Sequence, residues 1–221
     1  MRKTTFAIGE FYHIYNRGTE KRIIFLDERD FMRFLQSLEE FNTLDPIGGI
    51  FQNSFRKKQL RGRTSKLDKF VKQGEKLVNI VAYCLNPNHY HLILQQVADK
   101  GIEKFMQRLG TGYTMYFNNK YERSGALFQG KFKAVHIDSN TYLLHVSAYV
   151  NLNNHVHQLR GSTSKSSWIE YIERQSKGAI CDKKSVLGQF RKSEEYISFA
   201  RDSLRGIIER RGLLDESILL E

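Results

Sequence analysis

The sequence contains little of what marks several large classes of protein. Its 221 residues include only two cysteines and two prolines, and no run approaches the roughly 18 consecutive apolar residues of a membrane-spanning helix. The two cysteines, Cys84 and Cys181, are too few for a disulfide framework or a structural zinc site, and they favour a reducing compartment. With 16 glycines, 15 phenylalanines and 11 tyrosines, the chain is neither collagen-like nor disordered. We therefore expect a globular cytoplasmic protein that does not bind a membrane.

Acidic residues are also scarce relative to basic ones. The chain has 24 Asp and Glu against 35 Lys and Arg, a formal net charge of +11. Such an excess favours a polyanionic partner, and nucleic acid is the commonest one. The length suits one domain with an insertion or an extension.

The order of apolar patterns predicts an α+β fold. Strand patterns occupy 6–15, 78–85, 89–95 and 134–137, and helical spacing occupies 27–42, 102–121 and 138–153. The turn at 86–88 is so short that the strands around it form an antiparallel hairpin. The order β-α-β-β-α-β-α is that of the ferredoxin-like split βαβ fold, a four-stranded antiparallel sheet with helices on one face.

Two segments fall outside this pattern. Residues 43–77 carry a run of Lys and Arg that predicts an insertion, either a solvated positive loop or a clamp on phosphates, with one short helix at 65–73. Beyond 155 the chain is polar, with short helical patterns at 193–205 and 206–211. We therefore expect one main domain at 1–154, with the basic insertion at 43–77, and a C-terminal helical extension at 155–221.

The most informative local feature is His89-Tyr90-His91. Residues i and i+2 of a strand point to the same face, so both imidazoles can meet one metal ion while Tyr90 points to the other side. A His-x-His pair in a strand is more often structural. Its place directly after a tight turn favours the metal-binding interpretation.

A second pattern lies on the helix predicted at 138–153. Tyr142, His145, Tyr149 and Asn153 are spaced by three, four and four residues and would share one helical face. An aromatic stripe at this spacing usually belongs to a core, but the polar His and Asn suit a core poorly. If this face packs near the two histidines, Tyr149 presents its hydroxyl to the metal and Asn153 offers a carbonyl oxygen as third ligand.

Four segments together carry a family resemblance. They are YHIYNRG at 12–18, LNPNHYHLIL at 85–94, GALFQGKF at 125–132, and the stretch 142–153 that holds Tyr149 and Asn153. On these segments the chain resembles the single-tyrosine HUH transposases, which include small insertion-sequence transposases and those associated with repetitive extragenic palindromes. The resemblance covers about residues 6–154, so it implies that the main domain at 1–154 is catalytic.

The resemblance implies a metal-dependent endonuclease and strand transferase that acts on single-stranded DNA near hairpin or palindromic ends. By carry-over, His89 and His91 bind Mg²⁺ or Mn²⁺, Asn153 completes the metal site, and Tyr149 is the nucleophile of a 5′-phosphotyrosine intermediate. One position departs from the pattern. Relatives in the palindrome-associated branch often have Asn-Pro here, whereas Asn153 is followed by Asn154.

Candidate DNA contacts flank the predicted site. Arg17, Lys131 and Lys133 lie on loops and strand ends where they could hold phosphates, and we assign Arg17 and Lys131 to DNA binding. Phe128 and Phe132 could stack on an unpaired base or fill the core under their loop. His145, one turn before Tyr149, is a candidate acceptor for the phenolic proton.

Other functions remain open at this stage. A non-catalytic module that binds single-stranded nucleic acid would use aromatic side chains on an open sheet face. A metal-dependent nuclease that uses water would share the histidine pair, but Tyr149→Phe would leave its cleavage intact. A structural scaffold would leave both polar patterns unexplained. Family members include monomers and dimers that swap the tyrosine helix, so the sequence is also compatible with a homodimer.

Overall fold

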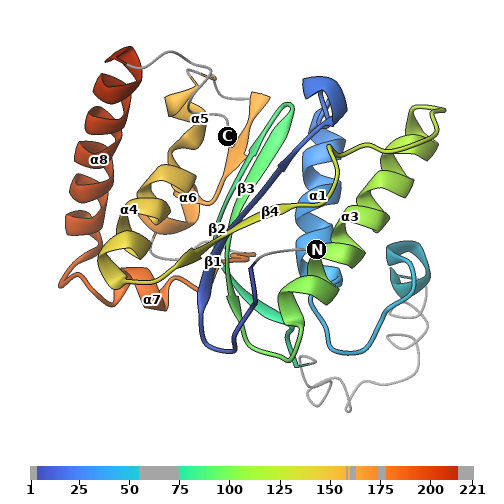
Figure 1. Cartoon of the computed structure of the whole chain (residues 1–221), viewed down its shortest axis with the longest axis horizontal. Helices are drawn as coiled ribbons and strands as arrows, with labels where there is room; N and C mark the ends of the chain where they lie inside the picture. The colour runs from blue at the N-terminus through green and yellow to red at the C-terminus, as the bar shows by residue number, and fades with distance from the viewer. Residues whose placement is uncertain (1–3, 55–74, 158, 160–162, 174–177, 214–221) are drawn as a thin grey trace.

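A five-stranded antiparallel sheet forms the middle layer of the protein (Figure 1). The computed structural model describes residues 4–54, 75–157, 159, 163–173 and 178–213. The strands are β1 Phe11–Arg17, β2 Val78–Asn86, β3 His89–Gln96, β4 Lys133–Ile137 and β5 Lys165–Ser166, in the order β4-β1-β3-β2-β5. The first four strands have the order of a split βαβ fold, which confirms the predicted ferredoxin-like α+β class. The predicted strand count of four is wrong, because the short β5 pairs with Cys84 and Leu85 at the edge of β2.

Helices α1 Glu28–Glu40 and α3 Gly101–Lys120 cover one face of the sheet. The Asp27 side chain accepts a hydrogen bond from the Asp30 backbone N–H, and the Asp30 side chain accepts one from the Asp27 backbone N–H, so α1 begins with a capping box. Even-numbered residues of β1 and β3, such as Ile14 and Leu92, are buried against these helices. This half of the molecule matches the expectation from the sequence.

The opposite face is covered as well, so the prediction of helices on one face only is wrong. This second layer consists of α4 Asn140–Asn151, α5 Asn153–Val156, α6 Trp168–Ile172, α7 Lys184–Leu187 and α8 Ser193–Leu213 (Figure 1). The reason lies in β2, where Val81, Ala82 and Cys84 turn away from the first core and need cover of their own. A strand that is apolar on both faces is typical of a sheet buried between two layers.

Several predicted boundaries shift in the structure. β1 begins later than predicted, because Gly9 adopts a positive φ in a turn, and it continues through Asn16 and Arg17. The helix predicted at 138–153 ends at Asn151, so Tyr149 and Asn153 belong to separate helices. The two short helices predicted after residue 193 form one helix, α8.

The basic insertion leaves and rejoins the fold at one place. The Leu44 backbone N–H donates to the Glu75 carbonyl at 2.9 Å, and Arg108 of α3 donates to the carbonyl of Leu44 at 3.1 Å. This junction precedes Val78, so it lies at the opposite end of β2 from the turn before His89. The helix predicted at 65–73 lies outside the described residues. No helix in the described ranges has the length and apolar character to cross a membrane.

A buried polar network connects α4 to its neighbours on the second face. The Tyr196 hydroxyl of α8 accepts from Asn151 Nδ2 at 2.8 Å and lies 3.1 Å from Ser147 Oγ. Ser167 Oγ contacts Asn151 Oδ1 at 2.5 Å and accepts from the Tyr83 backbone N–H at 2.9 Å. The network therefore fixes the C-terminal turn of α4, which holds Tyr149, against both β2 and α8.

We expect Tyr196→Phe to lower the free energy of unfolding by about 1–3 kcal/mol, since it leaves buried groups of Ser147 and Asn151 without this partner. Urea unfolding measures the change. Tyr142→Phe is the matched control, because Tyr142 is 38% exposed and its loss should change stability little. Equal stabilities for the two variants would show that the network does not hold α4.

Candidate active site

The register between β1 and β3 sets the positions of the site residues. Tyr15 lies opposite His91, and Arg17 lies opposite His89. These odd-numbered residues project toward the face that α4 covers. Tyr90 points to the other face, where its ring lies 5.2 Å from that of Phe34. The alternation expected from the His89-Tyr90-His91 sequence is therefore present.

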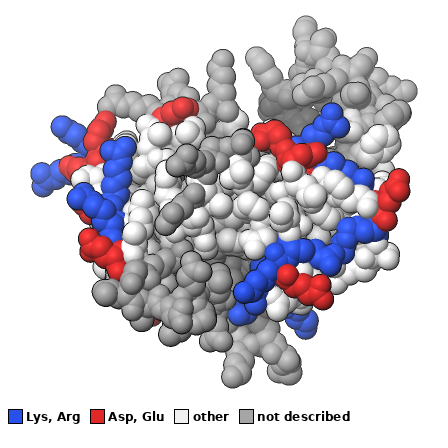
Figure 2. Space-filling model, turned by 90° about the horizontal axis from the view of Figure 1, so that it is seen from above, with Lys and Arg blue, Asp and Glu red and all other residues white. Residues whose placement is uncertain are grey.

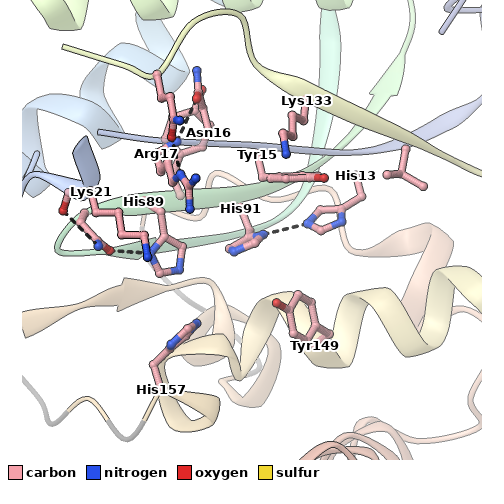
Figure 3. Close-up of a pocket in the computed structure, with 14 residues that line it drawn as sticks. His13, Tyr15, Asn16, Arg17, Lys21, His89, His91, Lys133, Tyr149 and His157 are labelled. Atoms are coloured by element: carbon pink, nitrogen blue, oxygen red, sulfur yellow. Dashed lines mark hydrogen bonds between the residues drawn. The ribbon is translucent and has the colours of Figure 1, made fainter. Parts of the chain in front are cut away.

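A pocket of about 350 Å³ lies between these strands and the helical layer (Figure 3). Its lining comes from β1, β3, β4, their connecting loops, α4 and the residue after α5, and comprises His13, Tyr15, Asn16, Arg17, Lys21, Asn88, His89, Tyr90, His91, Gln129, Lys133, Val135, Tyr149 and His157. Tyr149 and His157 approach from the helical side, whereas His89 and His91 approach from the sheet. The ring centroids of His91 and Tyr149 are 5.6 Å apart.

Hydrogen bonds fix the tautomer of His89. Its Nδ1 lies 2.7 Å from Asn88 Oδ1, which can only accept, so Nδ1 carries the proton. Its Nε2 lies 2.9 Å from Asn86 Nδ2 and accepts from that amide. In histidines that bind metals, one ring nitrogen typically donates its N–H to a carbonyl oxygen and the other carries the lone pair that binds the metal. His89 has this tautomer.

His91 is paired with a second histidine. Its Nδ1 lies 2.9 Å from His13 Nε2, and the two rings are stacked at 5.1 Å. Burial away from water lowers the pKa of His13 to about 4, so His13 is neutral near pH 7. One N–H between the neutral His13 ring and His91 therefore joins the pair, which orients His91 toward the pocket.

The Asn153 side chain is hydrogen-bonded to the Asn86 amide, and Asn86 connects it to His89. Asn153 is fully buried, and its Oδ1 accepts from Asn86 Nδ2 at 2.6 Å. Asn86 in turn contacts His89, so the three side chains form a chain below the pocket. The Asn153 amide nitrogen finds no hydrogen-bond partner among the described residues. Within those residues, no group of three or more His, Cys, Asp or Glu side chains is arranged to hold a metal.

The basic side chains divide between two places. Arg17 lines the pocket and bonds Gln129 through its Nε. Lys131 does not line the pocket but a neighbouring groove. Lys133, opposite Tyr15, takes the position at the pocket instead. On the face in Figure 2, the described Lys and Arg side chains lie among Asp and Glu side chains.

Three residues that line the pocket, His13, Tyr15 and His157, have no site role predicted from the sequence. His13 and Tyr15 stand two apart on β1, a spacing that places them on the face of Arg17, so alternation could have found them. His157 follows α5, and its ring lies 4.9 Å from that of His89. His157 reaches the pocket because the helix breaks after α4, and no pattern in the sequence indicates that break. His145 instead contacts Phe199, 5.1 Å between rings, and does not line the pocket.

Comparison with known proteins agrees with this geometry. The family model described as "Transposase IS200 like" matches residues 50–153, the stretch that contains the histidine pair, Tyr149 and Asn153. Over residues 50–153 the chain is an IS200-like transposase. No curated protein matches the transposase in sequence.

Solved structures contain a similar fold. One is described as a REP-associated tyrosine transposase bound to a REP hairpin. It is 12% identical to this transposase, with a TM-score of 0.50, and the match covers 81% of this chain and 95% of the other. At this identity the similarity shows that the two proteins share a fold.

The lowered pKa of His13 predicts a loss of stability in mild acid. The unfolded chain binds a proton at this residue near pH 6.5, whereas the folded chain does so only near pH 4. Stability therefore falls as the pH drops through this interval, by about 2 kcal/mol between pH 7 and pH 5. We expect His13→Gln to remove that part of the pH dependence in urea unfolding. The exposed His145→Gln should retain it, and an unchanged pH dependence in His13→Gln would contradict this assignment.

Proposed function

We propose that this transposase cleaves and rejoins single-stranded DNA with Tyr149 as nucleophile, at sites beside hairpin or palindromic ends. The observation that carries the proposal is the position of Tyr149, 5.6 Å from His91 between ring centroids, across a pocket lined by Arg17 and Lys133. The description of the structural relative as bound to a REP hairpin supports a hairpin substrate. Because Tyr149 faces the histidines of its own chain, the site needs no tyrosine from a second subunit.

The donor set fits a divalent metal. His89 would bind through Nε2, the nitrogen opposite its bond to Asn88, once Nε2 is released from the Asn86 amide, and His91 would bind through Nε2, opposite its bond to His13. Asn153 would supply an amide oxygen after releasing the Asn86 amide. A bound metal would polarise the scissile phosphate and offset its developing charge. Two imidazole donors suit Mn²⁺ better than Mg²⁺, which prefers oxygen ligands.

The chain's own residues would position the reacting atoms. Arg17, Lys21 and Lys133 surround the pocket and would hold the phosphates on either side of the scissile bond. The phenolic oxygen of Tyr149 attacks phosphorus and releases its proton to water, the bond from phosphorus to the 3′-oxygen breaks and that oxygen takes a proton from water, and the 5′-phosphate stays on the tyrosine. A second 3′-hydroxyl reverses the exchange, so rejoining needs no ATP. The hydrogen bonds that fix the last turn of α4 would hold the phenol at the pocket for this attack.

A covalent-capture assay tests the nucleophile. The purified protein is mixed with labelled DNA hairpins that carry single-stranded tails, with Mn²⁺, Mg²⁺ or EDTA, and run on denaturing gels. We expect a metal-dependent adduct that is absent in Tyr149→Phe and in His91→Ala. Tyr142→Phe, which removes an exposed hydroxyl from the same helix, should form the adduct at the wild-type level.

Two other results would favour different functions. Cleavage without an adduct, retained in Tyr149→Phe, would indicate a nuclease that uses water. Binding with neither cleavage nor an adduct, on hairpins that include a repeat bordering the gene, would indicate a non-catalytic binding module.

The position of Lys133 at the pocket predicts that this residue contributes to DNA affinity and to its salt dependence. Lys133→Ala should weaken binding and reduce the slope of log affinity against log salt by about 1, as expected for one lost phosphate contact. Lys104→Ala is the control, because Lys104 lies in the first turn of α3 and lines neither the pocket nor the groove beside it. Equal slopes of log affinity against log salt for the two variants, measured by fluorescence anisotropy, would show that Lys133 does not contact the DNA.

A further inference from the structure

A groove of about 740 Å³ lies beside the pocket, between α3 and the loop 126–132. We call it the α3 groove. Its α3 side follows one helical stripe that includes Met106, Gly110 and Thr114, and its other side carries Phe128 and Phe132. The catalytic chemistry proposed above uses none of these residues.

Gly110 leaves this groove open. A Cβ added at Gly110 would meet no heavy atom within 4 Å, whereas one added at Gly112 would lie 2.6 Å from the ring of Phe41. Close packing therefore explains Gly112 but not Gly110. A glycine in the middle of a helix is less favourable than alanine. Its structural effect here is an empty space at the centre of the groove floor.

The groove and the pocket lie on opposite faces of the sheet, near the same end of β1. Asn16 and Tyr90 line both, and Asn16 stands next to Arg17 at the end of β1. The Asn16 amide donates to the carbonyl of Gly130 at 3.3 Å, and Gly18 pairs with Phe128, so the end of β1 holds the groove's loop in place. A DNA strand that leaves the pocket past Arg17 would reach the α3 groove by passing over the end of β1 and the loop 126–132, which is bonded to Arg17 and Gly18.

The chemistry of the lining suits a flat aromatic ligand. The rings of Phe128 and Phe132 are partly buried against the first core, and Met115 is 67% exposed. Polar groups stand among them, notably Gln107 and the ammonium of Lys131. Aromatic and thioether surface stacks on a base of any sequence, while amides and a cation meet its edge and its phosphate. The bases of a duplex are already stacked, so only an unpaired base presents its face.

We propose that the α3 groove binds an unpaired base of the single-stranded DNA that flanks the cleavage site. The inference rests on the proposed function, since it takes single-stranded DNA as the substrate. It also assigns Lys131 to the single-stranded flank rather than to the reacting phosphate.

Filling the groove tests this proposal. Gly110→Phe places a ring on the groove floor, whereas Gly110→Ala adds a single methyl group in open space. We expect Gly110→Phe to lose on the order of tenfold in affinity for a tailed hairpin and to bind a hairpin without a tail like wild type. Gly110→Ala should bind both hairpins like wild type and should melt at a higher temperature.

A second measurement does not depend on the folding of a variant. Tails that carry 5-iodouracil at successive positions are irradiated in complex with the wild-type protein, and the crosslinked peptides are sequenced. We expect one tail position to crosslink to the peptide that contains Phe128 or Phe132. Crosslinks only elsewhere, or equal tail affinity in Gly110→Phe and Gly110→Ala, would overturn the groove assignment.

The outcome for the groove is separate from that for the proposed function. If the wild-type protein forms the tyrosine adduct but the groove variants bind the tail equally, only the groove assignment fails. If the wild-type protein forms no adduct, the proposed function fails, and the tail-affinity and crosslinking results still decide whether the groove holds a base.

Discussion

The pairing of β1 with β3 is the constraint on which the rest of the site depends. It places Tyr15 opposite His91 and Arg17 opposite His89, so imidazoles, a phenol and a guanidinium share one small area of the sheet. A slip of one residue in this register would turn the β1 side chains to the opposite face. The tight turn after Asn86 limits such slippage in the neighbouring hairpin, because only Pro87 and Asn88 connect β2 to β3.

The position of Tyr149, the proposed nucleophile, depends on the helical layer opposite α1 and α3 and on segments distant in the sequence. Tyr149 reaches the pocket because α4 packs on the second face of the sheet, where Tyr196 of α8 and Ser167 fix its last turn. The C-terminal segment therefore helps to build the site, although it lies after the residues that match the transposase family. Asn86 and Asn153 add a buried amide contact between β2 and α5. A transposase of this fold can thus present tyrosine and histidines from a single chain.

Local patterns predicted the parts of this structure that local physics determines. Alternation identified the face shared by His89 and His91, and capping with apolar spacing located α1. The second helical layer, β5 and the end of α4 at Asn151 depend on contacts between distant segments, which no short window contains. The same holds for His157, which the break after α4 brings to the pocket. The sequence also could not show which of Lys131 and Lys133 faces the pocket. The pairing of β4 with β1 decides this, because it places Lys133 opposite Tyr15.

The central claim is that a phosphodiester bond to DNA forms on Tyr149. The most direct measurement is mass spectrometry of the protein after reaction with a tailed hairpin and Mn²⁺, followed by nuclease trimming and peptide mapping. The account predicts a nucleotide remnant on the α4 peptide, localised by fragmentation to Tyr149 and joined through a 5′-phosphate. A remnant on another residue, or cleaved DNA whose 5′ ends are free of protein, would contradict it.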